Sequence, residues 1–267
     1  MKVVTKYPDG IFSWVDLATS DTDAAKAFYT GLFGWDAVGV ETDMGPIYTM
    51  YQIEGHTVAG MGPLPPDMQA QGVPPLWSSY IKHDDVDSVV AKASEAGGTV
   101  TMPPMDVMEE GRMAMIQDPS GAIFGVWQPK NHIGAALVNQ PNTLVWNELQ
   151  TNDVEACKAF YGKVFGWDTE TDGSGYVAFA QDNRMHAGMM KIDPSWGEVP
   201  PHWGVYFMVD DVEATSAKAK ELGGSVLMPP TPAGDIGRFS LVQDPQGGTF
   251  TVMEFSGPVD EPPGHEK

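Results

Sequence analysis

The sequence predicts an α+β fold of four βαβββ modules that form two domains in tandem, and three observations support it. The segment from Trp14 to Asp36, WVDLATSDTDAAKAFYTGLFGWD, returns from Trp146 to Asp168 as WNELQTNDVEACKAFYGKVFGWD, with thirteen of twenty-three positions identical. Shorter motifs, MPP, GR and QDP, recur later in the same order in both copies. Each copy also shows a strand pattern followed by a helix pattern twice over.

The first module opens at residues 10–19, where apolar and polar residues alternate as in a strand with one buried face. Residues 20–23 supply side-chain oxygens that favour a helix N-terminus, and Gly34 predicts the end of that helix. Between them lies an apolar stripe at helical spacing: Phe28, Tyr29, Leu32 and Phe33. Three further strands are expected over 35–41, 46–55 and 56–62.

The second module follows the same plan. Residues 76–83 predict a strand, and residues 84–98 predict a helix that ends in two glycines. Its three remaining strands are expected over 99–102, 112–117 and 122–128. The proline-containing segments 102–111 and 228–237 are interpreted as loops that border a cleft in each copy.

These patterns set the expected domain boundaries. The first domain is expected over 8–128 and the second over 143–256, joined by a linker at 129–142 and followed by a flexible tail at 257–267. Each half is long enough to bury a core of its own.

The composition excludes several classes of partner. There are 36 Asp and Glu residues against 15 Lys and Arg, a formal net charge of -21 that repels nucleic acids and anionic lipid surfaces. The absence of a long apolar segment predicts a cytoplasmic protein with no membrane partner. The single cysteine, Cys157, falls in the apolar pattern of a helix, which favours a buried structural thiol over a reactive one.

The order of these elements resembles the vicinal oxygen chelate superfamily, which includes glyoxalases, bleomycin-resistance proteins and extradiol dioxygenases. The resemblance is carried by DAAKAFYTGLFGW, by DDVDSVVAKASEAGG and by DPSG before the last strand. It covers nearly the whole chain and is strongest to two-domain glyoxalase-like proteins of actinobacteria. It implies that paired modules curl around a cleft, where the enzymes of the family hold a divalent metal with His, Gln or Glu ligands.

The residues at the implied ligand positions disagree with a metal. The resemblance places the ligands at Trp14, Gly60, Ser78 and Gly125 in the first copy, and at Trp146, Gly188, Gly204 and Thr251 in the second. An indole has no lone pair to give to a cation, and none of the eight is a His, Gln or carboxylate. We therefore expect no metal cofactor.

Strand alternation and the family's geometry together predict an aromatic cleft that suits a small apolar or aromatic molecule. Each tryptophan at a ligand position is either a stacking platform or a plug that closes a vestigial site. The candidate ligand-binding residues are Trp14, Tyr80, Trp127, Trp146, Tyr206 and Met253.

Two acidic residues, Asp16 and Glu148, share this face and need partners if they are buried. Arg112 and Arg238 are the candidate partners. Such a pair is either a buried salt bridge that holds two modules together or a catalytic pair that orients a ligand or transfers a proton.

The sequence thus favours a metal-free binding protein that sequesters or senses its ligand. The alternative is a divalent-metal lyase, isomerase or oxygenase that works in the second domain with His186, His202 and Glu148. A third interpretation is that the acidic two-domain chain binds another protein. The sequence leaves homodimerisation open.

Overall fold

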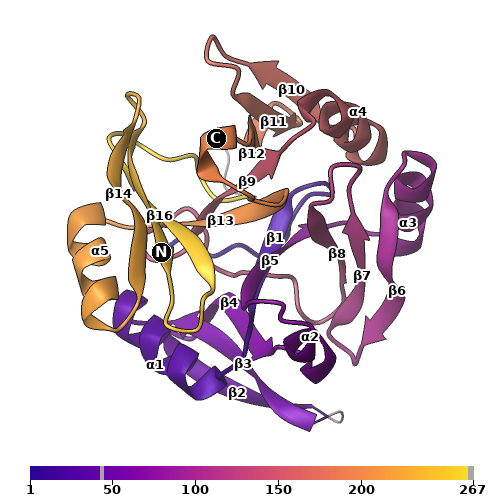
Figure 1. Cartoon of the computed structure of the whole chain (residues 1–267). Coiled ribbons are helices and arrows are strands. Elements are labelled where there is room, and N and C mark those ends of the chain that lie inside the picture. The colour runs from indigo at the N-terminus through magenta and orange to yellow at the C-terminus, as the bar shows by residue number, and fades with distance from the viewer. Residues whose placement is uncertain (43–44, 264–267) are drawn as a thin grey trace.

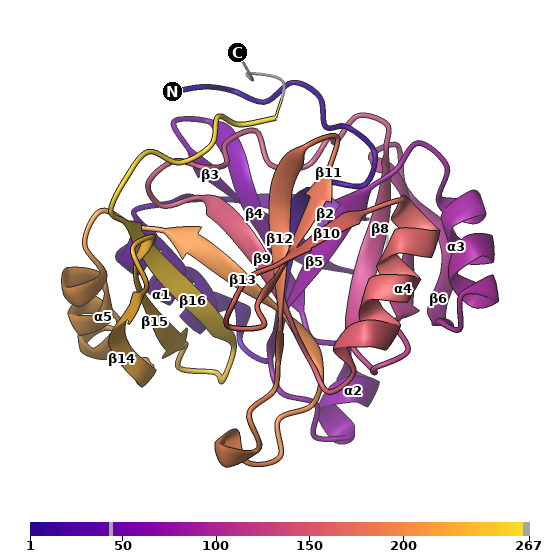
Figure 2. The ribbon, with the colours of Figure 1, turned by 90° about the horizontal axis from the view of Figure 1, so that it is seen from above.

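The computed structural model describes residues 1–42 and 45–263, and it contains two eight-stranded sheets (Figures 1 and 2). The strands of the first sheet are β1 (Phe12–Thr19), β2 (Asp36–Thr42), β3 (Gly45–Ile53), β4 (His56–Pro63), β5 (Leu76–Lys82), β6 (Thr99–Val107), β7 (Gly111–Gln117) and β8 (Ile123–Pro129). Those of the second are β9 (Leu144–Thr151), β10 (Asp168–Thr171), β11 (Val177–Gln181), β12 (Arg184–Lys191), β13 (His202–Met208), β14 (Ser225–Ala233), β15 (Gly237–Gln243) and β16 (Thr249–Phe255). The helices are α1 (Thr22–Phe33), α2 (Pro66–Ala70), α3 (Val86–Glu95), α4 (Val154–Phe165), α5 (Val212–Glu221) and the short 3₁₀ helix η1 (Pro194–Trp196).

The predicted α+β class and the tandem pair of domains are confirmed. The strand order is β2-β3-β4-β1-β5-β8-β7-β6 in the first sheet and β10-β11-β12-β9-β13-β16-β15-β14 in the second. In each sheet the first strands of two successive modules pair antiparallel at the centre, as β1 with β5 and β9 with β13. Each of these central strands also pairs in parallel with the last strand of its own module.

Helix α1 shows how local sequence sets an element. The side chain of Asp21 accepts a hydrogen bond from the Ala24 amide at 3.0 Å, which caps the first turn. Gly34 ends the helix with a left-handed backbone, φ 71°, that other residues rarely adopt. In the second copy, α4 likewise begins after an Asp153 cap and ends at Gly166.

The two hydrophobic cores are shared between the domains, although each half is long enough to bury a core of its own. Figure 1 shows α1 beside α5 and α4 beside α3. The buried Tyr29 of α1 donates to Asp244 before β16 at 2.8 Å, and Tyr161 of α4 donates to Asp118 before β8 at 3.0 Å. One face of each central strand pair carries the polar residue Asp16 or Glu148. The apolar opposite face needs a cover, which the other domain provides.

The two edge segments expected as loops are largely strands. Segments 102–111 and 228–237 overlap β6 and β14, which are edge strands whose pairing with β7 and β15 shifts register around the paired prolines. Proline is tolerated there because an edge strand can leave an amide position unpaired. Most of each segment therefore forms the edge of a sheet rather than a loop.

Cys157 lies in the apolar core, as a structural thiol requires. Its side chain is fully buried between Thr151 and Asp118, and burial followed by the nearby Asp118 carboxyl raises the pKa of its thiol to about 11. The thiol is therefore uncharged at neutral pH and is a poor nucleophile.

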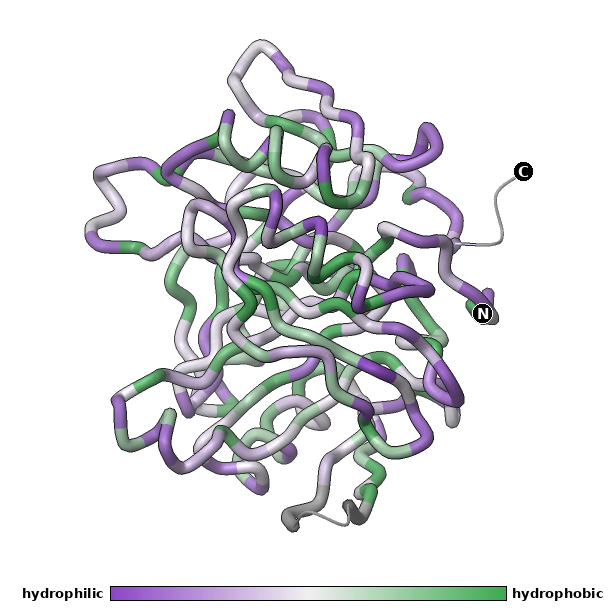
Figure 3. Tube along the Cα trace, turned by 90° about the vertical axis from the view of Figure 1, so that its right-hand side faces the viewer, coloured by the Kyte–Doolittle hydropathy of each residue, from purple (hydrophilic) through white to green (hydrophobic). Residues whose placement is uncertain are grey.

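The N-terminal arm and the last described residues of the tail lie on the same side of the molecule, where Lys2 contacts Glu261 (Figures 2 and 3). The N-terminal arm packs on the segment between the domains, where the Val4 amide donates to the Ala136 carbonyl at 2.8 Å. Hydrophobic stretches run through the middle of the molecule in Figure 3. In the part of the chain that the structure describes, no helix is both long and apolar enough to span a membrane.

Candidate functional site

A carboxylate held by tyrosines lies at the centre of each sheet. In the first sheet Asp16 accepts hydrogen bonds from the Tyr48 hydroxyl at 3.1 Å and from the Tyr80 hydroxyl at 3.3 Å. The indole of Trp14 donates to the Tyr48 oxygen at 3.2 Å. Strand register explains the grouping, since Trp14 lies opposite Tyr80 and Asp16 opposite Gly60.

The second sheet repeats the arrangement. Glu148 accepts a hydrogen bond from the Tyr206 hydroxyl at 2.6 Å and also contacts the hydroxyl of Tyr176. The indole of Trp146 donates to that same Tyr176 oxygen at 3.0 Å. The sequence interpretation missed Tyr48 and Tyr176. The signal was present, because they are aligned by the offset of 128 residues that also relates Gly60 to Gly188.

The predicted carboxylate–arginine pairs are wrong. Arg112 contacts both oxygens of Asp87 at 2.9 and 3.0 Å, and Arg238 contacts Glu213 at 2.6 Å. The reason is strand register: Arg112 lies opposite Gln128, whose side chain reaches the first turn of α3. Both arginines therefore face the helices, and tyrosine hydroxyls take the place expected for a cation.

Burial governs the protonation of both carboxyls. Desolvation raises the pKa of Asp16 to about 6, although the hydrogen bonds from Tyr48 and Tyr80 act in the opposite direction. Burial likewise raises the pKa of Glu148, against hydrogen bonds led by that from Tyr206. Each carboxyl is thus held closer to its neutral form than in water.

This shift predicts a pH dependence of stability. Because the pKa of Asp16 is raised in the folded chain, its contribution is full below about pH 4 and is lost as the pH rises through about 6. Asp16→Asn removes this titration. We expect the free energy of unfolding of the wild type to fall by about 2 kcal/mol relative to Asp16→Asn between pH 4 and pH 7.

Urea unfolding of both proteins at several pH values measures this difference. Asp36→Asn, at an exposed aspartate on β2, controls for the loss of a charge alone. A constant difference between wild type and Asp16→Asn across that range would refute the proposed titration of Asp16.

The residues at the implied ligand positions do not fit a metal ion. A Cβ atom added at Gly60 would overlap the Tyr48 hydroxyl, and one added at Gly125 would overlap the Tyr80 ring. At Gly188 the Tyr176 hydroxyl fills the corresponding place. Over residues 1–42 and 45–263, no three His, Cys, Asp or Glu side chains form a group that could hold a metal.

The alternative metal set is not brought together either. His186 lies on β12 with its ring centroid 4.6 Å from that of Trp167 and 6.2 Å from that of Phe12, two residues of the second shared core. The Nδ1 atom of His202 lies 2.9 Å from the Pro200 carbonyl oxygen. Only Glu148 of the three lies in the tyrosine cluster, so these residues do not support the metal site.

The first site is covered by the segment between the domains. The imidazole of His132 lies edge-on to Trp14, with ring centroids 4.4 Å apart and an interplanar angle of 85°. The His132 carbonyl accepts a hydrogen bond from the Trp127 indole at 2.8 Å. Trp14, Trp127 and Tyr80 are all buried. In this copy the tryptophan is therefore part of a closed packing arrangement, as the plug interpretation predicts.

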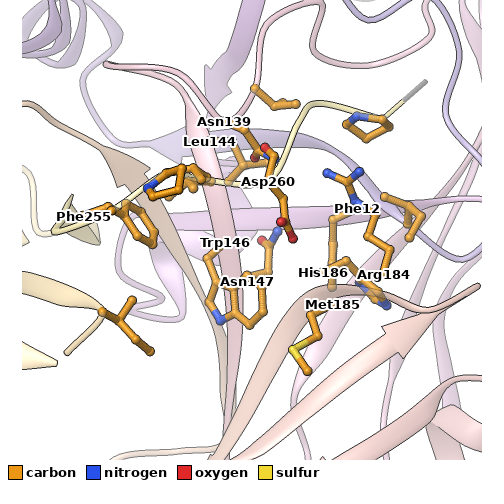
Figure 4. A pocket seen from close by; sticks show the side chains of 18 of the residues that line it. Phe12, Asn139, Leu144, Trp146, Asn147, Arg184, Met185, His186, Phe255 and Asp260 are labelled. Atoms are coloured by element: carbon orange, nitrogen blue, oxygen red, sulfur yellow. The ribbon is translucent and has the colours of Figure 1, made fainter. Parts of the chain in front are cut away.

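The second site borders a cavity of about 350 Å³ (Figure 4). Of the six predicted ligand-binding residues, Trp146 lines it, and this indole is only half-buried. Tyr206 and Met253 lie on the neighbouring central strands, and Met253 is buried. The N-terminal arm and the C-terminal tail complete the walls. Among the lining residues are Phe12, Asn147, Arg184, His186, Phe255 and Pro258.

Comparison with known proteins agrees with this architecture. The chain matches the family model of the glyoxalase/bleomycin resistance protein/dioxygenase superfamily over residues 11–126 and 141–252. It is 44% identical to "Putative glyoxylase CFP32" of Mycobacterium tuberculosis, over 94% of this chain and 97% of that protein. It is 36% identical to "Anthracycline biosynthesis protein DauV" of Streptomyces sp. strain C5, over 94% and 96%.

Among solved structures, the Mn(II)-bound glyoxalase from Novosphingobium aromaticivorans superposes with a TM-score of 0.65 at 18% identity, covering 94% of this chain and 84% of that one. This likeness concerns the fold. With two family matches that together span most of the sequence, the chain belongs to the glyoxalase/bleomycin resistance protein/dioxygenase superfamily.

Proposed function

We propose that this protein binds a small, largely apolar or aromatic molecule without a metal, in the cavity beside Trp146. The observation that carries the proposal is the filling of the ligand positions by the chain's own side chains. Tyr48 and Tyr80 occupy the space over Gly60 and Gly125, and Tyr176 occupies that over Gly188. A guest in such a site is held by contact, stacking and hydrogen bonds.

The walls of the cavity support an aromatic guest. The half-buried indole of Trp146 offers a flat apolar surface, and Phe12 and Phe255 line the same space. The name of the relative DauV refers to the biosynthesis of anthracyclines, which are flat polycyclic aromatic compounds. That chemistry fits an aromatic wall, and sequestration or sensing of such a molecule is part of our proposal.

Substitution of the two tryptophans tests the proposal. With 2-naphthol as the probe, we expect Trp146→Leu to weaken binding at least about tenfold, because the stacking surface is lost. The matched control is Trp14→Leu, because Trp14 lies against His132 in the closed site. This variant should bind the probe as tightly as the wild type does. Fluorescence titration measures both. Equal affinity of Trp146→Leu and wild type would contradict the proposal.

A second candidate function is a divalent-metal lyase, isomerase or oxygenase, and the name of the relative CFP32, a putative glyoxylase at 44% identity, favours it. It would need ligands beyond those at the implied positions. We also propose, from the sequence alone, that the protein is cytoplasmic and has no nucleic-acid or membrane partner. A homodimer and a protein partner are further proposals from the sequence.

A further inference from the structure

The two sites differ in what covers their tryptophans. The segments that follow β8 and β16 start alike, since the Lys130 amide donates to the Glu110 carbonyl at 3.0 Å and the Ser256 amide to the Ile236 carbonyl at 2.8 Å. These pairs are related by an offset of 126 residues, which aligns His132 with Pro258. In the first copy the aligned residue puts an imidazole against Trp14. In the second, Pro258 is part of the wall of the cavity beside Trp146.

The His132 ring therefore indicates which kind of chemical group fits beside Trp146, the equivalent position in the second copy. It is a planar aromatic ring edge-on to the indole, and burial lowers the pKa of its imidazole to about 4. The ring is thus neutral at physiological pH. Pro258 brings no such ring to the cavity, and Trp146 remains half-buried.

A second observation concerns His186 in the cavity wall (Figure 4). Both of its ring nitrogens are buried, and neither finds a hydrogen-bond partner among the residues that the structure describes. Burial, with a smaller effect of the Arg184 charge, lowers the pKa of this imidazole to about 3. A neutral imidazole offers one N–H donor and one acceptor nitrogen. The first copy has Val58 at this position, so the polar group belongs to the open site alone.

The charges in the wall disfavour an anion. The side chains of Asp235 and Asp260 line the cavity together with that of Arg184, so acidic groups outnumber basic ones among its described lining residues. The Arg184 guanidinium donates to the Glu261 carbonyl at 2.5 Å. The formal net charge of -21 acts in the same direction. A hydroxyl group can both donate to and accept from a neutral imidazole, and it carries no charge.

We infer that the cavity takes a neutral phenol, a planar aromatic molecule with a hydroxyl group. Its ring occupies the place beside Trp146 that the His132 imidazole occupies beside Trp14, and its hydroxyl hydrogen-bonds to His186. This inference rests on the proposed function, because it names the class of guest for the same cavity.

Three probes that share a ring test the inference: 2-naphthol, naphthalene and 2-naphthoate. Calorimetric and fluorescence titrations of the full chain should give 2-naphthol an affinity about tenfold higher than naphthalene, since a hydrogen bond to a buried unpaired group is gained. 2-Naphthoate should bind more weakly than 2-naphthol, because its charge meets the acidic wall.

His186→Leu should bring 2-naphthol down to the affinity of naphthalene and leave naphthalene unchanged. His186→Phe repeats the loss of hydrogen bonding while keeping a ring, and His56→Leu on β4 is the control for a histidine elsewhere. A circular-dichroism melt of each variant confirms that it is folded.

His132→Ala tests the replacement of the ring. Removal of this imidazole should open a second site beside Trp14, so that the number of naphthalene molecules bound per chain rises from one to two. If naphthalene and 2-naphthol bind the wild type equally, or if His132→Ala still binds one, the inference is overturned while the proposed function stands. If none of the probes binds, or Trp146→Leu binds them as the wild type does, the proposed function fails as well.

Discussion

Neither half of the chain is expected to fold as a monomer when residues 1–138 and 139–267 are produced separately. The reason is the shared cores: Phe28 and Phe33 of α1 pack on Phe250 of β16, which belongs to the other half. Tyr29 would lose its acceptor Asp244, and Tyr161 would lose Asp118. Buried hydroxyls without partners and uncovered aromatic rings together remove far more stability than a domain of this size holds in reserve.

Circular dichroism and sedimentation velocity check this expectation. Each half alone should lack a cooperative thermal transition as a monomer, and self-association of a half into a pair that copies the internal repeat would agree with the same physical cause. Mixing the halves should restore a one-to-one complex that melts cooperatively. A monomeric half with a sharp transition near that of the intact chain would show that the cores are separable.

The second large effect is expected at a glycine in an implied ligand position. Gly125→Ala should lower the free energy of unfolding by about 3 kcal/mol, because the new Cβ would overlap the Tyr80 ring in a packed sheet. The control is Gly204→Ala on β13, where the nearest atom, the Glu148 carbonyl oxygen, lies 3.7 Å from the new Cβ. That change should alter stability by no more than about 0.5 kcal/mol.

A double-mutant cycle with Tyr80→Ala assigns the cause. Once the ring is gone, Gly125→Ala should cost little further stability, so that the two changes couple strongly. Chemical denaturation of the four proteins gives the coupling energy. The same cost of Gly125→Ala with and without the Tyr80 ring would mean that the ring does not fill this position.

The sequence was sufficient for the fold and for part of the site. Repeat spacing and strand alternation predict the four modules and place Trp14 and Asp16 on one face, because period and register are local properties. They do not reveal that α1 packs on β16, since the partner of an apolar face is a matter of tertiary assembly. The lack of a His, Gln or carboxylate at the implied ligand positions was visible in the sequence. Strand alternation also predicts that Tyr80 faces the cleft, but it does not predict that Tyr48 and Tyr176 fill the space over Gly60 and Gly188.

The partner of Asp16 could not be predicted from residue type alone. Charge complementarity favoured Arg112, but β7 presents that side chain opposite Gln128, toward α3 and away from the central strands. A buried carboxyl is paired with a cation or with hydroxyl groups according to which side chains the neighbouring strands place on its face of the sheet. For Arg112, the register of β7 and β8 decides this face. The difference between a closed and an open tryptophan likewise depends on the path of the covering segment.

The most direct test is a titration of 2-naphthol into the purified protein before and after exhaustive treatment with a chelator, with elemental analysis of both samples. Binding through the chain's own side chains predicts the same affinity in both and no transition metal near one equivalent per chain. Near-stoichiometric Mn, Fe, Ni or Zn that the chelator removes together with the binding would contradict it.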